Sequence, residues 1–99
     1  MVSIMDDEYK KIIIEAFNKE VIHDLSVFSS ELHDDKEVVL AAVKCLGNNL
    51  AYASDRLKND LEVVMEALRE SEKAIMFVSN SMRKNVDVML LAVMKKGNN

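Results

Sequence analysis

Residues 35–59 read DKEVVLAAVKCLGNNLAYASDRLKN, and residues 60–84 read DLEVVMEALRESEKAIMFVSNSMRK with no gap between the two copies. Six aligned positions are identical, and nine more keep their polar or apolar character. A third copy, NVDVMLLAVMKKGNN, begins at Asn85, and a weaker copy with one extra residue precedes Asp35. Self-similarity at a fixed period of about 25 residues is typical of proteins built from stacked units.

Each copy is predicted to form two short helices, because its apolar residues recur at helical spacing. In the second unit we expect the first helix over about residues 37–46 and the second over about residues 49–58. A unit of this size cannot bury its apolar face alone, so neighbouring units must stack. The prediction is an all-α fold, a short α-solenoid-like bundle of about seven short helices. One domain, 1–99, then divides into units at about 9–34, 35–59, 60–84 and 85–99, and the truncated last unit acts as a cap.

The ends of the predicted helices carry suitable residues. Asp35, Asp60 and Asn85 directly precede the apolar runs, where a short polar side chain accepts from free backbone N–H groups. Gly47 and Gly97 follow the runs, and we expect them in the left-handed conformation that ends a helix.

The repeat also separates core positions from surface positions. One face of the third unit is apolar and the opposite face is charged, as in a helix half buried against a neighbour. The core candidates of this unit are Val63, Val64, Ala67, Leu68, Ile75, Phe77, Val78 and Met82. Their counterparts in the second helix of the preceding unit are Leu50, Tyr52, Ala53 and Leu57. Core positions also hold Met65 and Met89, so packing explains most of the seven methionines.

Composition limits the class of protein. Hydrophobic residues make up 49% of the 99, there is no proline, and two glycines are too few for a sandwich or barrel with many tight turns. The single cysteine excludes an intramolecular disulfide and favours a reducing compartment. The sequence has no apolar run of roughly 18 residues and no signal-peptide pattern. We therefore expect a cytoplasmic protein that does not enter a membrane.

The net charge of −4 is unevenly distributed. Residues 1–37 hold ten acids and four lysines, giving −6, whereas residues 38–99 hold seven acids and nine bases, giving +2. An acidic first third argues against binding to nucleic acid, which requires a basic surface. It could favour a basic protein partner, although solvated helix faces explain the same charges.

The run over residues 35–60 resembles the repeat of a domain of unknown function, DUF4116. Members of that family carry the pattern D-x-E-V-V-L-A-A-V-x-x-x-G-x-x-L-x-Y-A-S-x-x-L-x-x-D. The matching positions here are Asp35, Glu37 to Val43, Gly47, Leu50, Tyr52 to Ser54, Leu57 and Asp60. The resemblance implies an array of repeats and no established activity. Glu72 stands where the pattern has glycine, so the turn between the third pair of helices is expected to depart from it.

Residues that could support catalysis or metal binding show no familiar spacing. His23 and His33 are ten residues apart, which is not the i, i+3 or i+4 spacing of helical metal ligands. Cys45 aligns with Glu70 on a polar stripe, which indicates a partly exposed thiol without a role. A serine recurs once per unit, as a helix-bonding or packing residue would and a nucleophile would not: Ser29, Ser54 and Ser79. We therefore expect no enzyme activity, no bound metal and no cofactor.

Protein binding is the function that remains. The first hypothesis is a non-catalytic protein–protein interaction module, which binds through exposed positions that differ between units. Met94 falls on a position that is basic in other units, Lys44 and Arg69. Leu91 aligns with Ala41 and Glu66, and Met76 replaces Ala51. An exposed leucine at the end of an array favours either a protein partner or self-association into a homo-oligomer.

The second hypothesis is a small acidic inhibitor, from a phage or pathogen, that blocks a basic site on a host enzyme. The short chain and the acidic residues Asp6, Asp7 and Glu8 motivate it. A third interpretation, an inert structural part of a larger array, fits the same sequence.

Overall fold

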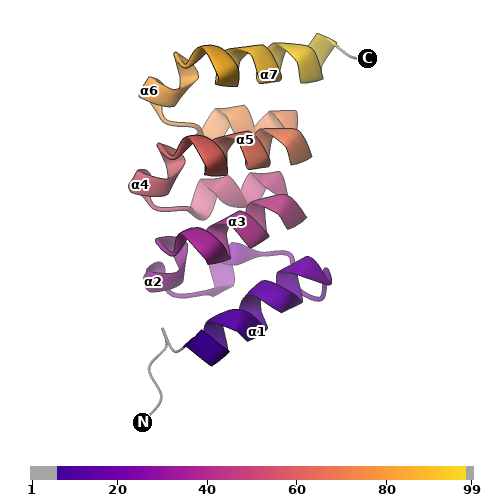
Figure 1. Ribbon diagram of the computed structural model, residues 1–99, viewed down its shortest axis with the longest axis vertical. Helices are drawn as coiled ribbons and strands as arrows, with labels where there is room; N and C mark the ends of the chain where they lie inside the picture. The colour runs from indigo at the N-terminus through magenta and orange to yellow at the C-terminus, as the bar shows by residue number, and fades with distance from the viewer. Residues whose placement is uncertain (1–6, 98–99) are drawn as a thin grey trace.

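The computed structural model describes residues 7–97, and in this part of the chain it contains helices and no strand (Figure 1). The prediction of an all-α fold is confirmed. The helices, with 3-10 helices labelled η, are α1 (Asp7–Asn18), η1 (Leu25–Val27), α2 (Ser30–His33), α3 (Lys36–Cys45), η2 (Gly47–Tyr52), α4 (Asp55–Lys58), α5 (Leu61–Glu70), η3 (Glu72–Phe77), α6 (Asn80–Arg83) and α7 (Val86–Gly97).

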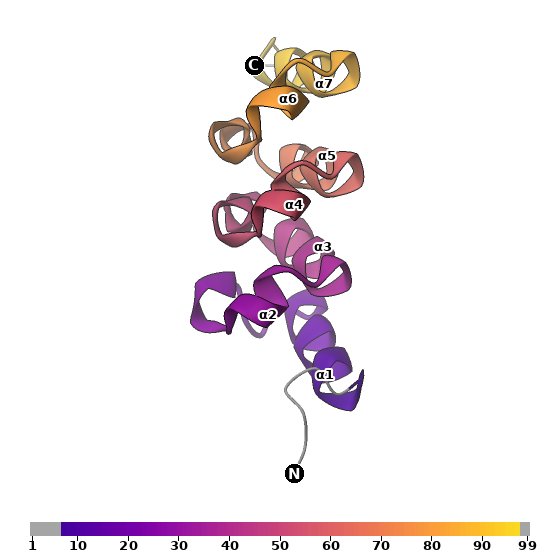
Figure 2. The ribbon, with the colours of Figure 1, turned by 90° about the vertical axis from the view of Figure 1, so that its left-hand side faces the viewer.

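The four long helices lie in one row. Helix α1 packs on α3, α3 on α5 and α5 on α7, and Figure 2 shows these helices along one side of the molecule. The 3-10 helices form a second row, in which η1 contacts η2 and η2 contacts η3. The result is an elongated body of 49 × 25 × 17 Å. Among the described residues, no helix combines the length and the apolar character needed to cross a membrane.

The predicted helix caps are confirmed. The side chain of Asp35 accepts from the amide of Val38 at 3.1 Å, and Asp60 accepts from Val63 at 3.3 Å. Asn85 does the same for the first turn of α7. Each cap satisfies a backbone donor that the helix itself leaves unpaired.

The recurring serines bond to helix ends, as predicted, in two of three units. The Ser54 hydroxyl accepts from the amide of Leu57 and donates to Asp34, and Ser79 accepts from the amide of Met82 and donates to Asn59. Ser29, the residue preceding α2, makes no such capping bond. The serines of the second and third units therefore start a short helix and also connect it to the preceding unit.

The second helix of each unit is not continuous, so the expected count of about seven helices, two per unit, is wrong. The segment predicted over residues 49–58 is a 3-10 helix, η2, followed by the separate short helix α4. Ala53 and Ser54 between them have extended backbone, because Ser54 acts as the N-cap of α4. The Ser54 amide instead donates to the carbonyl of His33 in the preceding unit at 3.0 Å.

The role predicted for the glycines is also wrong. Among the described residues no glycine has a positive φ. Gly47 is needed for space: a Cβ at this position would lie 2.5 Å from the carbonyl oxygen of Ala67 in α5. Helix α7 continues through Gly97 instead of ending before it.

The core follows the pattern of the repeat. The two adjacent valines near the start of α3 and of α5 are fully buried, and so are Ala42 of α3 and Ala67 of α5. The second segments contribute Leu50, Leu57, Ala74 and Val78, while Ile75, Phe77 and Met82 pack at the edge of the core. Tyr52 was expected in the core but is exposed. The side chains that hold the units together are Val38, Val39, Ala42, Val43, Val63, Val64, Ala67 and Leu68.

Candidate interaction surface

Helix α7 buries one side and exposes the other. Val88 is fully buried against the preceding unit, as its counterparts in α3 and α5 are. Met89 and Val93, by contrast, are 52% and 67% exposed, although the equivalent Val64 and Leu68 are completely buried. The prediction that Met89 packs in the core is therefore wrong. Helix α5 packs against both α7 and η3, among other segments, whereas Met89 and Val93 of α7 remain exposed in the described part of the chain.

The exposed residues of α7 form one continuous apolar face. Residues at i, i+3, i+4, i+7 and i+8 of a helix lie on the same side. We call this surface the open face, and its exposed members are Val86, Met89, Leu90, Val93 and Met94. A contiguous apolar surface of this kind is typical of a binding site for another protein.

A groove runs beside the open face, between α7 and η3. It encloses about 340 Å³, and its floor and walls are almost entirely apolar. We call it the terminal groove, and its lining residues are Ile75, Met76, Arg83, Met89, Ala92 and Val93. Arg83 is its charged member, and the guanidinium donates to the Met76 carbonyl at 2.9 Å.

The groove extends toward Glu72, which replaces the glycine found one unit earlier. Glu72 and Ala92 line an adjoining hollow of about 290 Å³, whereas the equivalent pair, Gly47 and Ala67, is in close contact. A residue with a Cβ cannot approach the next helix as closely as Gly47 does. The departure expected at Glu72 is thus a wider junction between η3 and α7.

The residues predicted to bind a partner lie at two ends of the molecule. Met76 lines the terminal groove and is 69% exposed, and Met94 on the open face is 64% exposed. Leu91 was expected to be exposed, but it is half-buried and packs against the core on the inner side of α7. The open face therefore includes Met89 and Val93 in place of Leu91.

The acidic candidates lie at the opposite end of the chain, near α1 (Figure 1). Asp6 lies outside the described residues, Asp7 is the first residue of α1, and Glu8 is exposed. Helix α1, which contains Asp7 and Glu8, lies at the other end of the molecule from the open face of α7 (Figure 1). Glu8 therefore belongs to a different surface from Met76 and Met94.

Lysine residues connect the first three long helices. Lys10 of α1 pairs with Glu37 at 2.8 Å and Asp35 at 3.3 Å, and the two carboxylates raise the pKa of Lys10. Lys36 of α3 pairs with Glu62 at 3.0 Å and Asp60 at 3.1 Å, which likewise raises its pKa.

The equivalent position in α5 is Leu61, so this pair of contacts is not repeated at the junction with α7. Lys95 of α7 instead donates to the Arg69 carbonyl at the end of α5.

Asn49 is a structural residue that the sequence did not single out. It is the buried polar side chain among the described residues, and all of its polar atoms are bonded. Its amide nitrogen donates to the carbonyls of His23 at 2.7 Å and Ala42 at 2.9 Å, and its oxygen accepts from the amide of Leu25 at 3.1 Å. The repeated Gly-Asn-Asn of residues 47–49 and 97–99 was the available signal.

The histidines and the cysteine are not equivalent in the structure. The His33 ring bonds the Leu25 carbonyl through Nε2 at 2.9 Å. His23, in contrast, lies close to Cys45 and Glu20, and the potential ligand atoms of the three side chains are within 4.8 Å of one another. The spacing along the sequence did not indicate this cluster. Burial, and then the nearby carboxylates of Glu20 and Glu70, raise the pKa of the Cys45 thiol.

These features define an all-α protein with helical units of similar sequence and an apolar surface at its last helix. A family model matches residues 35–83 and 62–99, which together cover about two thirds of the chain. The chain belongs to that family, described as a domain of unknown function (DUF4116). Comparisons with curated proteins and with solved structures found no match.

Proposed function

We propose that this chain is a non-catalytic protein-interaction module, and that its open face and terminal groove bind a short helical segment of a protein partner. The observation that carries the proposal is the exposure of Met89 and Val93 at positions that are fully buried in the preceding unit. Burying apolar surface is the main favourable contribution to most protein association.

The preceding junction indicates what kind of segment fits. There η3 packs against η2 and α5, and its Ala74 is completely buried. In the terminal groove, Met89 and Val93 hold the positions of Val64 and Leu68 but are exposed, and the partly buried Ile75 lines the groove beside them. A partner helix with a small apolar residue toward the groove and larger apolar residues beside it would reproduce that contact.

The proposal includes the finer architecture expected from the repeat. The order α, 3-10, α occurs three times, and equivalent helices contact each other in succession. We infer from this that the units form a short α-solenoid-like array, in which the open face is the surface that a further unit would cover. A partner, or a second copy in a homo-oligomer, would take the place of that unit.

Capture of partners by matched variants tests the proposal. Met89→Glu together with Val93→Glu places two charges on the open face, at exposed positions where the fold should tolerate them. Ile12→Glu is the control, because Ile12 is 64% exposed on α1 at the other end. The immobilised chain is incubated with extract of the cells that produce it, and bound proteins are quantified by mass spectrometry.

We expect the double variant to lose a protein that both the unchanged chain and the Ile12→Glu control retain. Circular dichroism of each variant checks that the fold is intact. Equal recovery of every bound protein by all three chains would contradict the proposal.

The acidic-inhibitor hypothesis has less support. Asp34 pairs with Arg56 at 3.0 Å, and Asp35 and Glu37 both pair with Lys10. Several acids of the first third therefore stabilise contacts between units. A separate experiment tests this hypothesis. Reversing the charges of Asp6, Asp7 and Glu8 should weaken inhibition of the host enzyme, and that inhibition should decrease with added salt.

A further inference from the structure

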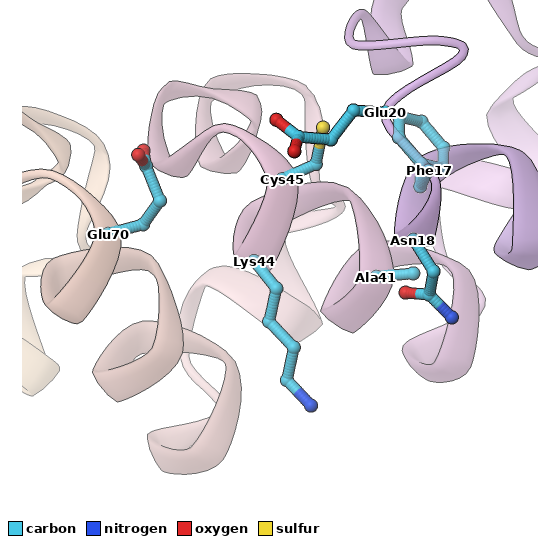
Figure 3. A pocket seen from close by; sticks show the side chains of 7 residues that line it. All are labelled: Phe17, Asn18, Glu20, Ala41, Lys44, Cys45 and Glu70. Carbon is cyan, nitrogen blue, oxygen red and sulfur yellow. The ribbon is translucent and has the colours of Figure 1, made fainter.

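Three side chains of metal-binding type meet beside the C-terminal end of α3. Glu20 follows α1, His23 lies in the connection to η1, and Cys45 is the last residue of α3. Their potential ligand atoms all lie within 4.8 Å of one another. Figure 3 shows the Glu20 carboxylate and the Cys45 sulfur next to each other at the edge of a hollow.

The backbone around this cluster is held by specific contacts. At the end of α1, the amide of Val21 donates to Ala16 at 2.9 Å and that of Glu20 donates to Phe17 at 3.0 Å, which turns the chain back toward α3. The carbonyl of His23 is fixed by the buried Asn49. The three ligand positions are therefore held near each other by the fold.

Glu20 occupies a conformation that is unfavourable for its residue type. Its φ is 58°, and it is the non-glycine residue of the described chain with a positive φ. Glycine is the usual residue at this position after a helix, because a Cβ is strained there. A carboxylate is thus present where glycine would be the more stable choice. Strained backbone of this kind is concentrated at binding and catalytic sites.

We propose that Glu20, His23 and Cys45 form a binding site for a divalent ion of the zinc class. Thiolate, imidazole and carboxylate are the three ligand types that Zn²⁺ takes in proteins. Neighbouring ligand atoms of a tetrahedral Zn²⁺ lie roughly 3.5 Å apart. Small rotations of the exposed Glu20 and His23 side chains would close the present separation to that value.

A hollow lined by Glu20 and Cys45 adjoins the cluster and would leave room for a water molecule as a further ligand. This hollow encloses about 290 Å³, and Lys44 and Glu70 lie on its wall (Figure 3). Two anionic ligands, the thiolate and the carboxylate, would neutralise the charge of the ion. Because its ligands come from the segment after α1 and from the end of α3, the ion would connect these two helices.

The site is particular to the junction between α1 and α3. Cys45 aligns with Glu70 in the next unit, and Glu70 accepts a hydrogen bond from the Gly47 amide there. The cluster is therefore not a general feature of the repeat. It is also independent of the open face at α7.

Titration of the full chain with Co²⁺ tests the proposal, because Co²⁺ reports its ligands by absorption. Cys45 is the one cysteine, so a sulfur-to-cobalt charge-transfer band can come from no other residue. With a reductant that contains no thiol, we expect this band and intense visible bands to saturate at one Co²⁺ per chain. Addition of Zn²⁺ should then abolish both.

Variants separate a ligand role from a structural one. Cys45→Ser should eliminate the charge-transfer band, and His23→Gln should weaken Co²⁺ binding about tenfold or more. Glu20→Gly is the sharpest variant: it relieves the backbone strain, so the metal-free chain should unfold at a higher temperature while Co²⁺ affinity falls about tenfold or more. Glu72→Gln is the control, because Glu72 is an exposed acid of η3 that is not one of the three potential ligands.

The proposal is overturned if the unchanged chain gives no sulfur-to-cobalt band at saturating Co²⁺. It is equally overturned if His23→Gln and Glu20→Gly bind Co²⁺ with the affinity of the unchanged chain. Both substitutions fall at exposed residues, so the result does not depend on whether Cys45→Ser folds.

Discussion

The junction between α3 and α5 and the junction between α5 and α7 use equivalent positions, but the first is the more tightly closed. At the first, Lys36 connects the helices and Gly47 allows close contact with α5. At the second, Leu61 and Glu72 hold those positions, and a groove remains open beside α7. A few substitutions in one template thus leave the junction between α5 and α7 more open than the junction between α3 and α5.

The same comparison explains why the open face is apolar. A helix inside the row needs two apolar sides, one for each neighbour, and α7 retains both although it buries one. The exposed second side, which includes Met89 and Val93, is the surface to which we propose that a partner binds.

The largest expected difference between the two junctions is at one pair of equivalent core positions. Leu68→Ala should lower the free energy of unfolding by about 3 kcal/mol, because it leaves a cavity at a fully buried site. Val93→Ala should change it by less than about 0.5 kcal/mol, because Val93 is exposed. Urea unfolding followed by circular dichroism measures both. A loss at Val93 as large as that at Leu68 would mean that the open face is buried in solution.

A smaller difference is expected at the two positions that decide how closely the helices approach. Gly47→Ala should destabilise the chain by about 2 kcal/mol, because the new Cβ would lie 2.5 Å from the Ala67 oxygen and 3.1 Å from the Ser71 Cβ. Glu72→Ala should be nearly neutral, since Glu72 is exposed and lines a hollow. Equal effects of the two substitutions, again by urea unfolding, would remove the explanation given for the wider junction.

Local features of the sequence predicted much of the fold. Cap residues such as Asp35 and Asp60 act on their own first turn, and apolar periodicity identifies the buried side of a helix such as α5. The break inside the second segment of each unit was missed, because η2 and α4 are too short for helical periodicity to resolve. The signal for the break was Ser54, whose hydroxyl starts a new helix.

The candidate sites were less predictable, because they depend on how distant segments meet. An apolar residue such as Met89 at a core position of the repeat does not reveal whether a neighbouring segment covers it. Its exposure could therefore not be inferred from its position in the repeat. Leu91 was assigned to the surface by analogy with Glu66, but α7 places it against the core. The meeting of Glu20 with Cys45 results from the path of the chain after α1, which the histidine spacing does not encode.

The smallest expected effect is the pH dependence of the stability that the junction between α3 and α5 contributes. Burial opposes ionisation of Asp60, but the hydrogen bonds from Lys36 and from the Val63 amide outweigh it and hold the pKa of Asp60 below its usual value. A carboxyl whose pKa is lower in the folded state stabilises the fold above its unfolded pKa of about 3.9. That contribution is lost as the pH falls through the lower folded value.

Lys36→Leu places at the junction between α3 and α5 the residue type that Leu61 provides at the junction between α5 and α7. The substitution therefore removes part of the stabilisation by Asp60. We expect the variant to be slightly less stable at pH 7, and the difference to shrink toward zero as the pH falls below about 3.9. Partly exposed ion pairs are weak and screened by salt, so added salt should also reduce the difference. Urea unfolding at a series of pH values provides the measurement. If the difference persists unchanged in acid, Lys36 contributes through its packing and not through its charge.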